Sequence, residues 1–235
     1  MMIKLEKTSV MNFENAIRGA RNPMNSWDRS DSYFANYTDT SGMKYKQLDF
    51  YDDIMTDWMT LGENDLNLAK RLVKAGSDHR KFLRQIFVSV DITAPLYWWK
   101  EFDTYKVATV ANSCSTMHKI HAKQFTFDDF SHEHLYSRFG ESYEAMDCLT
   151  DIIDCLNKYR DLYLDTKDKL WWWQMIQLLP SSYNQLRTVT LNYETLINIY
   201  HARKHHKLDE WHTVCDWIET LPYFKEMCLE GGSEE

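Results

Sequence analysis

The sequence predicts a helix-rich α+β fold, and three observations support this prediction. Short strand-like runs alternate with longer runs of helical periodicity. The chain has 235 residues, of which 44% are hydrophobic, so it can bury a sizeable core. Seven Gly and four Pro are spread over it without a linker-like stretch. We therefore expect one domain over residues 1–225 and a solvated C-terminal tail over residues 226–235.

The first third of the chain predicts a strand followed by two helices. Residues 3–9 (IKLEKTS) alternate polar and apolar side chains like an edge strand. Residues 13–20 (FENAIRGA) form a short helix, which turn and cap residues in 21–32 close. A further helix ends at Gly76, a residue type that commonly follows a helix C-terminus. Its apolar positions are Leu66, Leu68, Ala69, Leu72 and Val73.

The middle of the chain contains the clearest strand. Residues 85–92 (QIFVSVDI) alternate and are rich in β-branched and aromatic side chains. The run after Pro95 (LYWWKEFDTYKVATVANS) is long enough for a helix and a loop. Within it, residues 104–116 (TYKVATVANSCST) are expected to form a loop entering a helix.

The last third predicts helices with one short strand between them. A long helix is expected over residues 142–163, because its apolar side chains follow the three-and-four spacing of one buried face. Residues 170–180 (LWWWQMIQLLP) form another apolar helix, residues 188–190 a short strand, and residues 193–217 a last helical region. The buried face of the long helix comprises Met146, Leu149, Ile152, Ile153, Leu156, Tyr159 and Tyr163.

Charge and composition exclude several classes of protein. The net charge of -8 and the pI near 5.6 argue against binding extended nucleic acid, which needs clustered Lys and Arg, although an acidic chain can still bind one phosphate locally. Without an apolar leader or a run of about 20 apolar residues, we expect a cytoplasmic protein that does not enter a membrane. The five cysteines have neither a CxxC pair nor regular spacing, which indicates free thiols.

The segment 104–116 lies where proteins often keep their chemistry, yet it contains one cation, no acid and no histidine. Its frame resembles the flavin-dependent thymidylate synthase family. The family signature is Arg-His-Arg, seven residues, Ser, one residue and Arg, and it follows an Ala-Pro turn and an aromatic-rich helix. Here APLYWWKEF precedes TYK, VATVANS, C, S and T, which fill that frame without a gap.

The C-terminal part is more similar to the same family. LLP is followed by TLNYETLINIYHAR, in which Asn192, Asn198 and Arg203 stand at the family's spacing. One departure is Glu194, where the family usually has arginine. AIRGAR and LVKAG also resemble family segments, so the resemblance extends from near the start to about Trp217.

This resemblance implies a helix-rich domain around a small, mostly antiparallel sheet. It also implies a homotetramer with sites between subunits. The family reaction is the reductive methylation of dUMP to dTMP, with methylenetetrahydrofolate as donor, FAD as cofactor and NADPH as reductant of the flavin. The cofactor carries the redox chemistry in such a reaction, and the protein supplies positioning and electrostatics.

Residue by residue, the resemblance implies flavin contacts at Lys106, Asn192 and Asn198. It implies substrate contacts at Arg203 and at Cys114, which replaces the signature Ser. It assigns no catalytic residue and no metal ligand.

Several charged family residues are replaced in this chain. Thr104 and Tyr105 stand where the signature begins with Arg and His, Thr116 replaces its last Arg, and Ile176 replaces an arginine before Leu-Pro. Lys106 is a point charge without the planar fork of arginine. We therefore expect the family's activity to be lost or strongly reduced.

The residues alone allow two interpretations of Asn192, Asn198 and Arg203. Asn192 and Arg203 are eleven residues apart and would fall on nearly one helix face, with Asn198 well round the cylinder. One helix could thus present an amide and a guanidinium to the same ligand. The alternative is that Arg203 pairs with an acid such as Asp209 and that the asparagines cap or bond locally.

Other candidate sites have weaker support. The pairs His201/His205 and His118/His121 could bind a metal, but without compact Cys or carboxylate ligands they favour solvated helix faces. Cys114 could be a nucleophile beside His118, although a buried, unreactive thiol is favoured. The tryptophans are typical of core or subunit interface, and we expect at least one to meet a partner subunit. They are Trp98, Trp99, Trp171, Trp172 and Trp173.

Two classes of function follow. The first is an enzyme of the flavin-dependent thymidylate synthase type. The second is a catalytically inactive descendant that binds a nucleotide or a protein partner through the old cleft.

Overall fold

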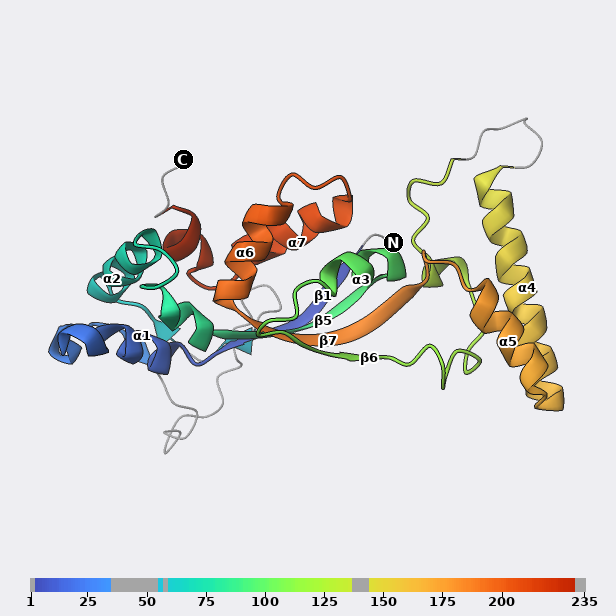
Figure 1. Cartoon of the computed structure of the whole chain (residues 1–235), viewed down its shortest axis with the longest axis horizontal. Helices are drawn as coiled ribbons and strands as arrows, with labels where there is room; N and C mark the ends of the chain where they lie inside the picture. The colour runs from blue at the N-terminus through green and yellow to red at the C-terminus, as the bar shows by residue number, and fades with distance from the viewer. Residues whose placement is uncertain (1–2, 35–54, 57–58, 137–143, 231–235) are drawn as a thin grey trace, which may run out of the picture. The chain divides into compact units, whose positions relative to one another are not determined.

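The computed structural model describes residues 3–34, 55–56, 59–136 and 144–230 (Figure 1). The helices are α1 (Phe13–Arg21), α2 (Glu63–Lys74), α3 (Leu96–Phe102), α4 (Ala145–Thr166), α5 (Lys169–Leu178), α6 (Tyr193–Arg203) and α7 (Asp209–Thr220). The strands are β1 (Lys4–Met11), β2 (Tyr33–Phe34), β3 (Met55–Thr56), β4 (Met59–Thr60), β5 (Phe87–Pro95), β6 (Val110–Ser113) and β7 (Asn184–Asn192). Short 3₁₀ helices are η1 (Asn22–Met24), η2 (Trp27–Arg29), η3 (Lys81–Gln85) and η4 (Phe127–Asp129), and a π-helical turn is η5 (Lys225–Leu229).

The main sheet has the strand order β3-β1-β5-β7-β6, and β2 and β4 form a separate antiparallel pair. Strands β5 and β7 are antiparallel, because Ser89 faces Thr190 while Asp91 faces Thr188, with 2.6 Å between side-chain oxygens in each pair. The predicted helix-rich α+β fold with a small, mostly antiparallel sheet is confirmed. Strand β1 is not at the edge, since β3 pairs with it in parallel at two positions.

Three predictions of local structure are wrong in detail. The segment after residue 104 does not enter a helix but forms β6, where the backbone N–H of Cys114 continues the pairing to Leu186 of β7. Strand β7 spans nine residues rather than three. The last helical region is two helices, because α6 ends at Arg203 and α7 begins at Asp209. Residues 142–143 of the predicted long helix lie outside the described residues.

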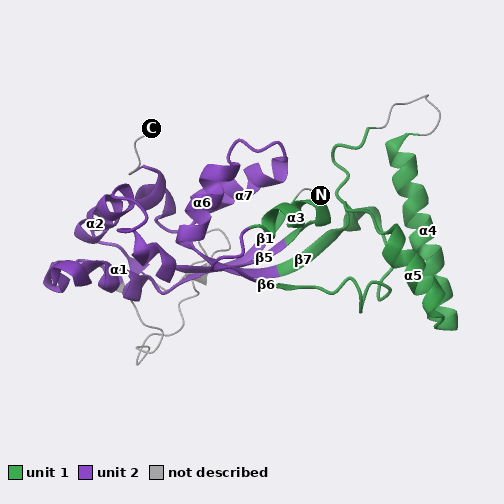
Figure 2. Cartoon of the chain, viewed as in Figure 1, with its two compact units in different colours: residues 1–4, 93–104, 112–187 green, residues 5–92, 105–111, 188–235 purple. Residues whose placement is uncertain are grey.

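The chain divides into two compact units (Figure 2). Unit 1 comprises residues 1–4, 93–104 and 112–187, and unit 2 comprises residues 5–92, 105–111 and 188–235. The expectation of a single domain stays a prediction. The proposed tail boundary is wrong, because residues 226–229 lie in η5, which packs on α2 with buried Met227 and Cys228.

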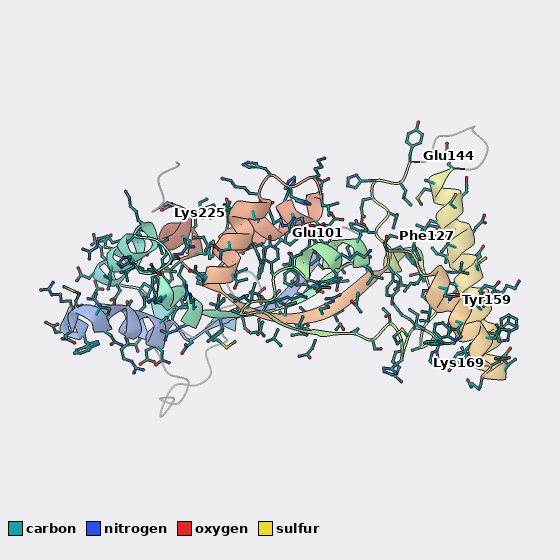
Figure 3. All side chains as sticks on the ribbon, in the orientation of Figure 1. Glu101, Phe127, Glu144, Tyr159, Lys169 and Lys225 are labelled. Atoms are coloured by element: carbon teal, nitrogen blue, oxygen red, sulfur yellow. The ribbon has the colours of Figure 1, made fainter. Side chains whose placement is uncertain are left out.

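Unit 1 is built on the pair α4 and α5, which lie side by side (Figure 1). The predicted face of α4 is confirmed: Leu149, Ile153 and Leu156 are buried in a cluster with Met175 of α5. Figure 3 labels Tyr159 on α4 and Lys169 on α5. The ring of Tyr159 stacks on Trp171 at 5.9 Å between centroids. The aromatic run of α5 therefore packs against α4, while Trp173 stays 42% exposed.

Unit 2 has an aromatic core around Tyr193, the first residue of α6. Its ring meets Phe13 and Phe224 edge to face, at 5.6 and 5.2 Å between centroids. Its hydroxyl donates to the carbonyl of Pro222, so its one polar atom is satisfied. This packing fixes the start of α6. Among the described residues, no helix combines the length and apolar character needed to cross a membrane.

Candidate functional site

Asn192 is the N-cap of α6 and is 3% exposed. Its Oδ1 accepts from the backbone N–H and the hydroxyl of Thr195, at 2.9 and 3.1 Å. Its Nδ2 donates to the carbonyl of Arg84. A capping asparagine satisfies a backbone donor that the first helical turn leaves unpaired. Both polar atoms of this side chain are therefore bonded within unit 2.

Asn198 lies in the middle of α6, is exposed, and accepts from Arg80 at 3.4 Å. Arg80 also binds Glu194, with its Nε 3.0 Å from Oε2 and its Nη2 3.2 Å from Oε1. Both partners of this two-pronged ion pair are largely buried, with side chains 19% and 12% exposed. The glutamate that departs from the family pattern is thus matched by an arginine from the segment before η3.

Arg203 is the last residue of α6, and aromatic rings surround its guanidinium. Its Nε donates to the hydroxyl of Tyr105 at 2.8 Å. Its Cζ lies 4.8 Å from the ring centroid of Trp211 in α7 and 5.4 Å from that of Tyr105. These contacts combine a hydrogen bond with cation–π attraction. They hold the guanidinium within unit 2.

The loop of residues 105–111 is attached to α6 at two points. Tyr105 contacts Arg203 at the end of the helix, and the carbonyl of Val107 accepts from Thr195 in the first turn. Lys106 lies between these attachments in sequence and is exposed. Ala108 has a positive φ of 55°, which L-residues rarely adopt. The four residues that the family resemblance selects in unit 2 are therefore gathered around α6.

A cavity of about 590 Å³ lies in unit 1, and Cys114 and Thr116 line it. These two residues stand at the positions of the signature's Ser and last Arg. The remaining wall supplies hydroxyls, two lysines, two carboxylates and two amides. Among these are Lys4, Ser115, Lys123, Asp129, Asn184 and Gln185. Polar groups of both charges thus surround a volume suited to a small ligand.

Lys123 forms an ion pair with Asp129 at the cavity wall. Asp129 also accepts from the backbone N–H and the hydroxyl of Thr126, in a capping box of η4. Tyr183 lines the same cavity. Burial, followed by the nearby Asp129 and Cys114, raises the pKa of its hydroxyl, which therefore stays protonated.

All five cysteines are free, but their surroundings differ. Cys215 and Cys228 are buried, and burial raises the pKa of their thiols to about 11 and about 12. Cys114, Cys148 and Cys155 are exposed. The prediction of a buried Cys114 is wrong, because this residue follows β6, an edge strand whose four residues are all exposed.

The adjacent amides of Asn184 and Gln185 behave differently in the cavity wall. Gln185 is bonded twice: its Nε2 donates to the carbonyl of Cys114 at 2.8 Å, and its Oε1 accepts from Arg187 at 3.0 Å. Both polar atoms of Asn184 are buried without a hydrogen-bond partner in the described part of the chain. The sequence did not single out Asn184, Lys123 or Arg80, since their roles depend on contacts between distant segments.

The structure also bears on the two histidine pairs. Within residues 3–34, 55–56, 59–136 and 144–230, no group of three His, Cys, Asp or Glu side chains could hold a metal ion. Burial and nearby cations lower the pKa values of His121 and His201, which favours their neutral forms.

The three positions that resemblance gives to the flavin do not fit FAD well. Asn192 is buried and has both polar atoms engaged. Asn198 accepts from Arg80, which itself is committed to Glu194. Lys106 is exposed and offers one charged group.

Of the comparisons with known proteins, only that with solved structures bears on the fold. No protein-family model matches the chain, and no curated protein matches its sequence. Two structures of the flavin-dependent thymidylate synthase ThyX from Helicobacter pylori, each with FAD and dUMP, are similar to it at TM-score 0.63. Their identities are 14% and 13%, over 99% of this chain and 100% of theirs. The UMP/dUMP methylase PolB from Streptomyces cacaoi, bound with 5-Br dUMP, gives TM-score 0.58 at 12% identity, over 98% of this chain and 95% of that one. The chain therefore has a fold like that of these proteins.

Proposed function

We propose that this protein binds a pyrimidine nucleotide such as dUMP and does not make dTMP at a rate typical of flavin-dependent thymidylate synthases. Fold similarity to nucleotide-bound proteins supports the first half of the proposal. The observation that carries it is the unit 1 cavity, which Cys114 and Thr116 line. The replaced arginines and the engaged Asn192 support the second half.

The cavity has the groups that a nucleoside monophosphate needs. Lys4 and Lys123 supply positive charge for a phosphate, which requires cations or N–H donors to offset its desolvation. The hydroxyls of Ser115, Thr116 and Thr126 add neutral donors and acceptors. Asp129 keeps the Lys123 ammonium at the wall. In this proposal Cys114 contributes to substrate contact and Arg203 does not, although the family resemblance implies a substrate contact for Arg203.

We also propose that the protein is an oligomer, and specifically the homotetramer that the family resemblance implies. The alternative is that the protein still catalyses the family reaction, and in that case it would use FAD, NADPH and methylenetetrahydrofolate. Purified protein that carries the absorption bands of a flavin would favour that alternative. Light scattering at micromolar protein is expected to give a mass several times that of one chain, and a monomer would contradict it.

Calorimetric titration with dUMP tests the nucleotide site. Wild type is expected to bind, and Lys123→Met to weaken binding by about 1–2 kcal/mol, because a charge-assisted phosphate contact is lost. Lys119→Met is the matched control, since Lys119 is exposed and absent from the cavity wall. No heat of binding with wild type, or equal losses in the two variants, would contradict the proposal.

A further inference from the structure

Asn184, the first residue of β7, is the best candidate for a recognition group that the sequence did not reveal. It lines the unit 1 cavity, and its Nδ2 and Oδ1 are buried without a hydrogen-bond partner among the described residues. The next residue provides an internal comparison, because both polar atoms of the Gln185 side chain are bonded.

An unpartnered buried carboxamide destabilises a fold. Most buried polar side-chain atoms in proteins find a partner, so each exception calls for a ligand, an ordered water or a functional reason. An apolar side chain of similar volume would avoid the desolvation cost at this strand end. Asn184 adjoins a cavity that has the volume of a small-ligand site, which favours the ligand as the reason.

We infer that Asn184 recognises the base of the bound nucleotide through hydrogen bonds, an inference that rests on the function proposed above. A carboxamide carries a donor beside an acceptor, and the lactam edge of uracil presents the complementary pair. Nδ2 would donate to the ring carbonyl O4, and Oδ1 would accept from the ring N3–H. Both atoms are buried in this structure, so the side chain would have to rotate toward the cavity to make these bonds.

The rest of the wall fits the remainder of the same ligand. Lys4 and Lys123 supply charge for the phosphate, and Thr93 and Thr126 supply hydroxyls for the sugar. Gln185 does not share this recognition role, because its amide already joins Cys114 to Arg187. Asn184 is thus a specificity-determining residue and not a catalytic one.

The test pairs a change in the protein with a change in the ligand. Wild type and Asn184→Leu are titrated with dUMP, with N3-methyl-dUMP and with 2′-deoxyribose 5-phosphate. Wild type is expected to bind dUMP at least about tenfold more tightly than the other two ligands. N3-methylation replaces the N3–H donor with a methyl group that abuts Oδ1, and 2′-deoxyribose 5-phosphate has no base with which to make either hydrogen bond. Asn184→Leu is expected to bind dUMP and N3-methyl-dUMP equally. Gln177→Leu, an amide replacement at an exposed position of α5 outside the cavity wall, is expected to behave as wild type.

A stability measurement adds a second readout. Without nucleotide, Asn184→Leu is expected to melt at a higher temperature than wild type, because the variant no longer buries an unsatisfied amide. A lower melting temperature would show that the amide is satisfied structurally, and would overturn the inference.

The outcomes also separate the inference from the proposed function. If wild type binds dUMP and N3-methyl-dUMP equally well, the nucleotide site stands and the role of Asn184 is refuted. If wild type binds no dUMP, both are refuted. If Asn184→Leu does not fold, equal affinities of wild type for dUMP and N3-methyl-dUMP would still refute the role of Asn184.

Discussion

The polar residues around α6 in unit 2 and those around the cavity in unit 1 differ in how far the protein satisfies them. Around α6, Asn192 caps the helix, Glu194 pairs with Arg80, and Arg203 is held by Tyr105 and Trp211. In the cavity wall, Lys123 and Gln185 are bonded too, but the carboxamide of Asn184 has no partner in the described chain. The residues that best match the family pattern are thus bonded internally. A retained sequence pattern does not by itself show a retained ligand.

The largest effect that this comparison predicts is on turnover. Because the residues around α6 are engaged and several charged family residues are replaced, formation of dTMP is expected to fall many orders of magnitude below a family enzyme. The assay supplies dUMP, methylenetetrahydrofolate, NADPH and excess FAD, alongside rescue of a thymidine-requiring bacterial strain. An active flavin-dependent thymidylate synthase is the positive control. Robust turnover or rescue would mean that the active site has been rebuilt rather than lost.

The second largest effect is expected in the reactivity of the thiols, which should differ between the two units. At pH 8, the exposed Cys114, Cys148 and Cys155 of unit 1 are expected to be alkylated at least about a hundredfold faster than the buried cysteines of unit 2. The reason is that burial raises the pKa of Cys215 and Cys228 to about 11 and about 12, which leaves little thiolate. Mass spectrometry of digested protein measures the rate at each site.

Nucleotide provides the control for this reaction. Saturating dUMP is expected to slow alkylation of Cys114, which lines the cavity, and to leave Cys148 unchanged. Equal protection of the two thiols, or none at Cys114, would place the nucleotide elsewhere.

The third largest effect is expected on stability, from the ion pair between Arg80 and Glu194 of α6. Arg80→Ala is expected to lower the free energy of unfolding by about 2 kcal/mol, because it leaves the carboxylate of Glu194 without its partner. Adding Glu194→Gln should recover part of this loss. Urea unfolding measures both, and Lys81→Ala at an exposed neighbouring position is the matched control. A loss from Arg80→Ala no larger than that of the control would show that the pair contributes little.

The smallest effect is expected at Arg203. Arg203→Ala should lower the free energy of unfolding by about 1 kcal/mol through lost contacts with Tyr105 and Trp211. Its affinity for dUMP should stay near that of wild type. A loss of about 1.5–3 kcal/mol in that affinity would instead show that Arg203 binds the nucleotide, as the family resemblance implies.

The sequence predicted best where one periodicity governs a long segment. The apolar face of α4 could be predicted because its spacing repeats over several turns, and Leu149, Ile153 and Leu156 are indeed buried. Strand β6 could not be predicted in the same way, because it is exposed and owes its conformation to pairing with β7. Polar residues at the start of β7 likewise concealed its full length.

The candidate site was predictable only in part, for a related reason. The resemblance selected Cys114 through its place in the signature frame, and this residue does line a cavity. It could not indicate Arg80, which reaches Glu194 across 114 positions of sequence. Nor could it indicate Asn184, which is important because its side chain lacks a hydrogen-bond partner in the described chain and not because of its residue type. Whether a polar side chain is paired or unpaired depends on tertiary contacts, which a local sequence pattern does not contain.

Strand β6 also bears on how the protein behaves in concentrated solution. It lies at the end of the strand order, its sequence VANS carries no charge, and Val110 is 65% exposed. Natural sheets usually protect such edges with lysine, proline or a bulge, because an uncovered edge can pair with another chain. Aggregation during expression or storage is therefore expected to start at this strand unless another surface covers it. A lysine introduced at Ala111 offers a practical way to keep the protein in solution.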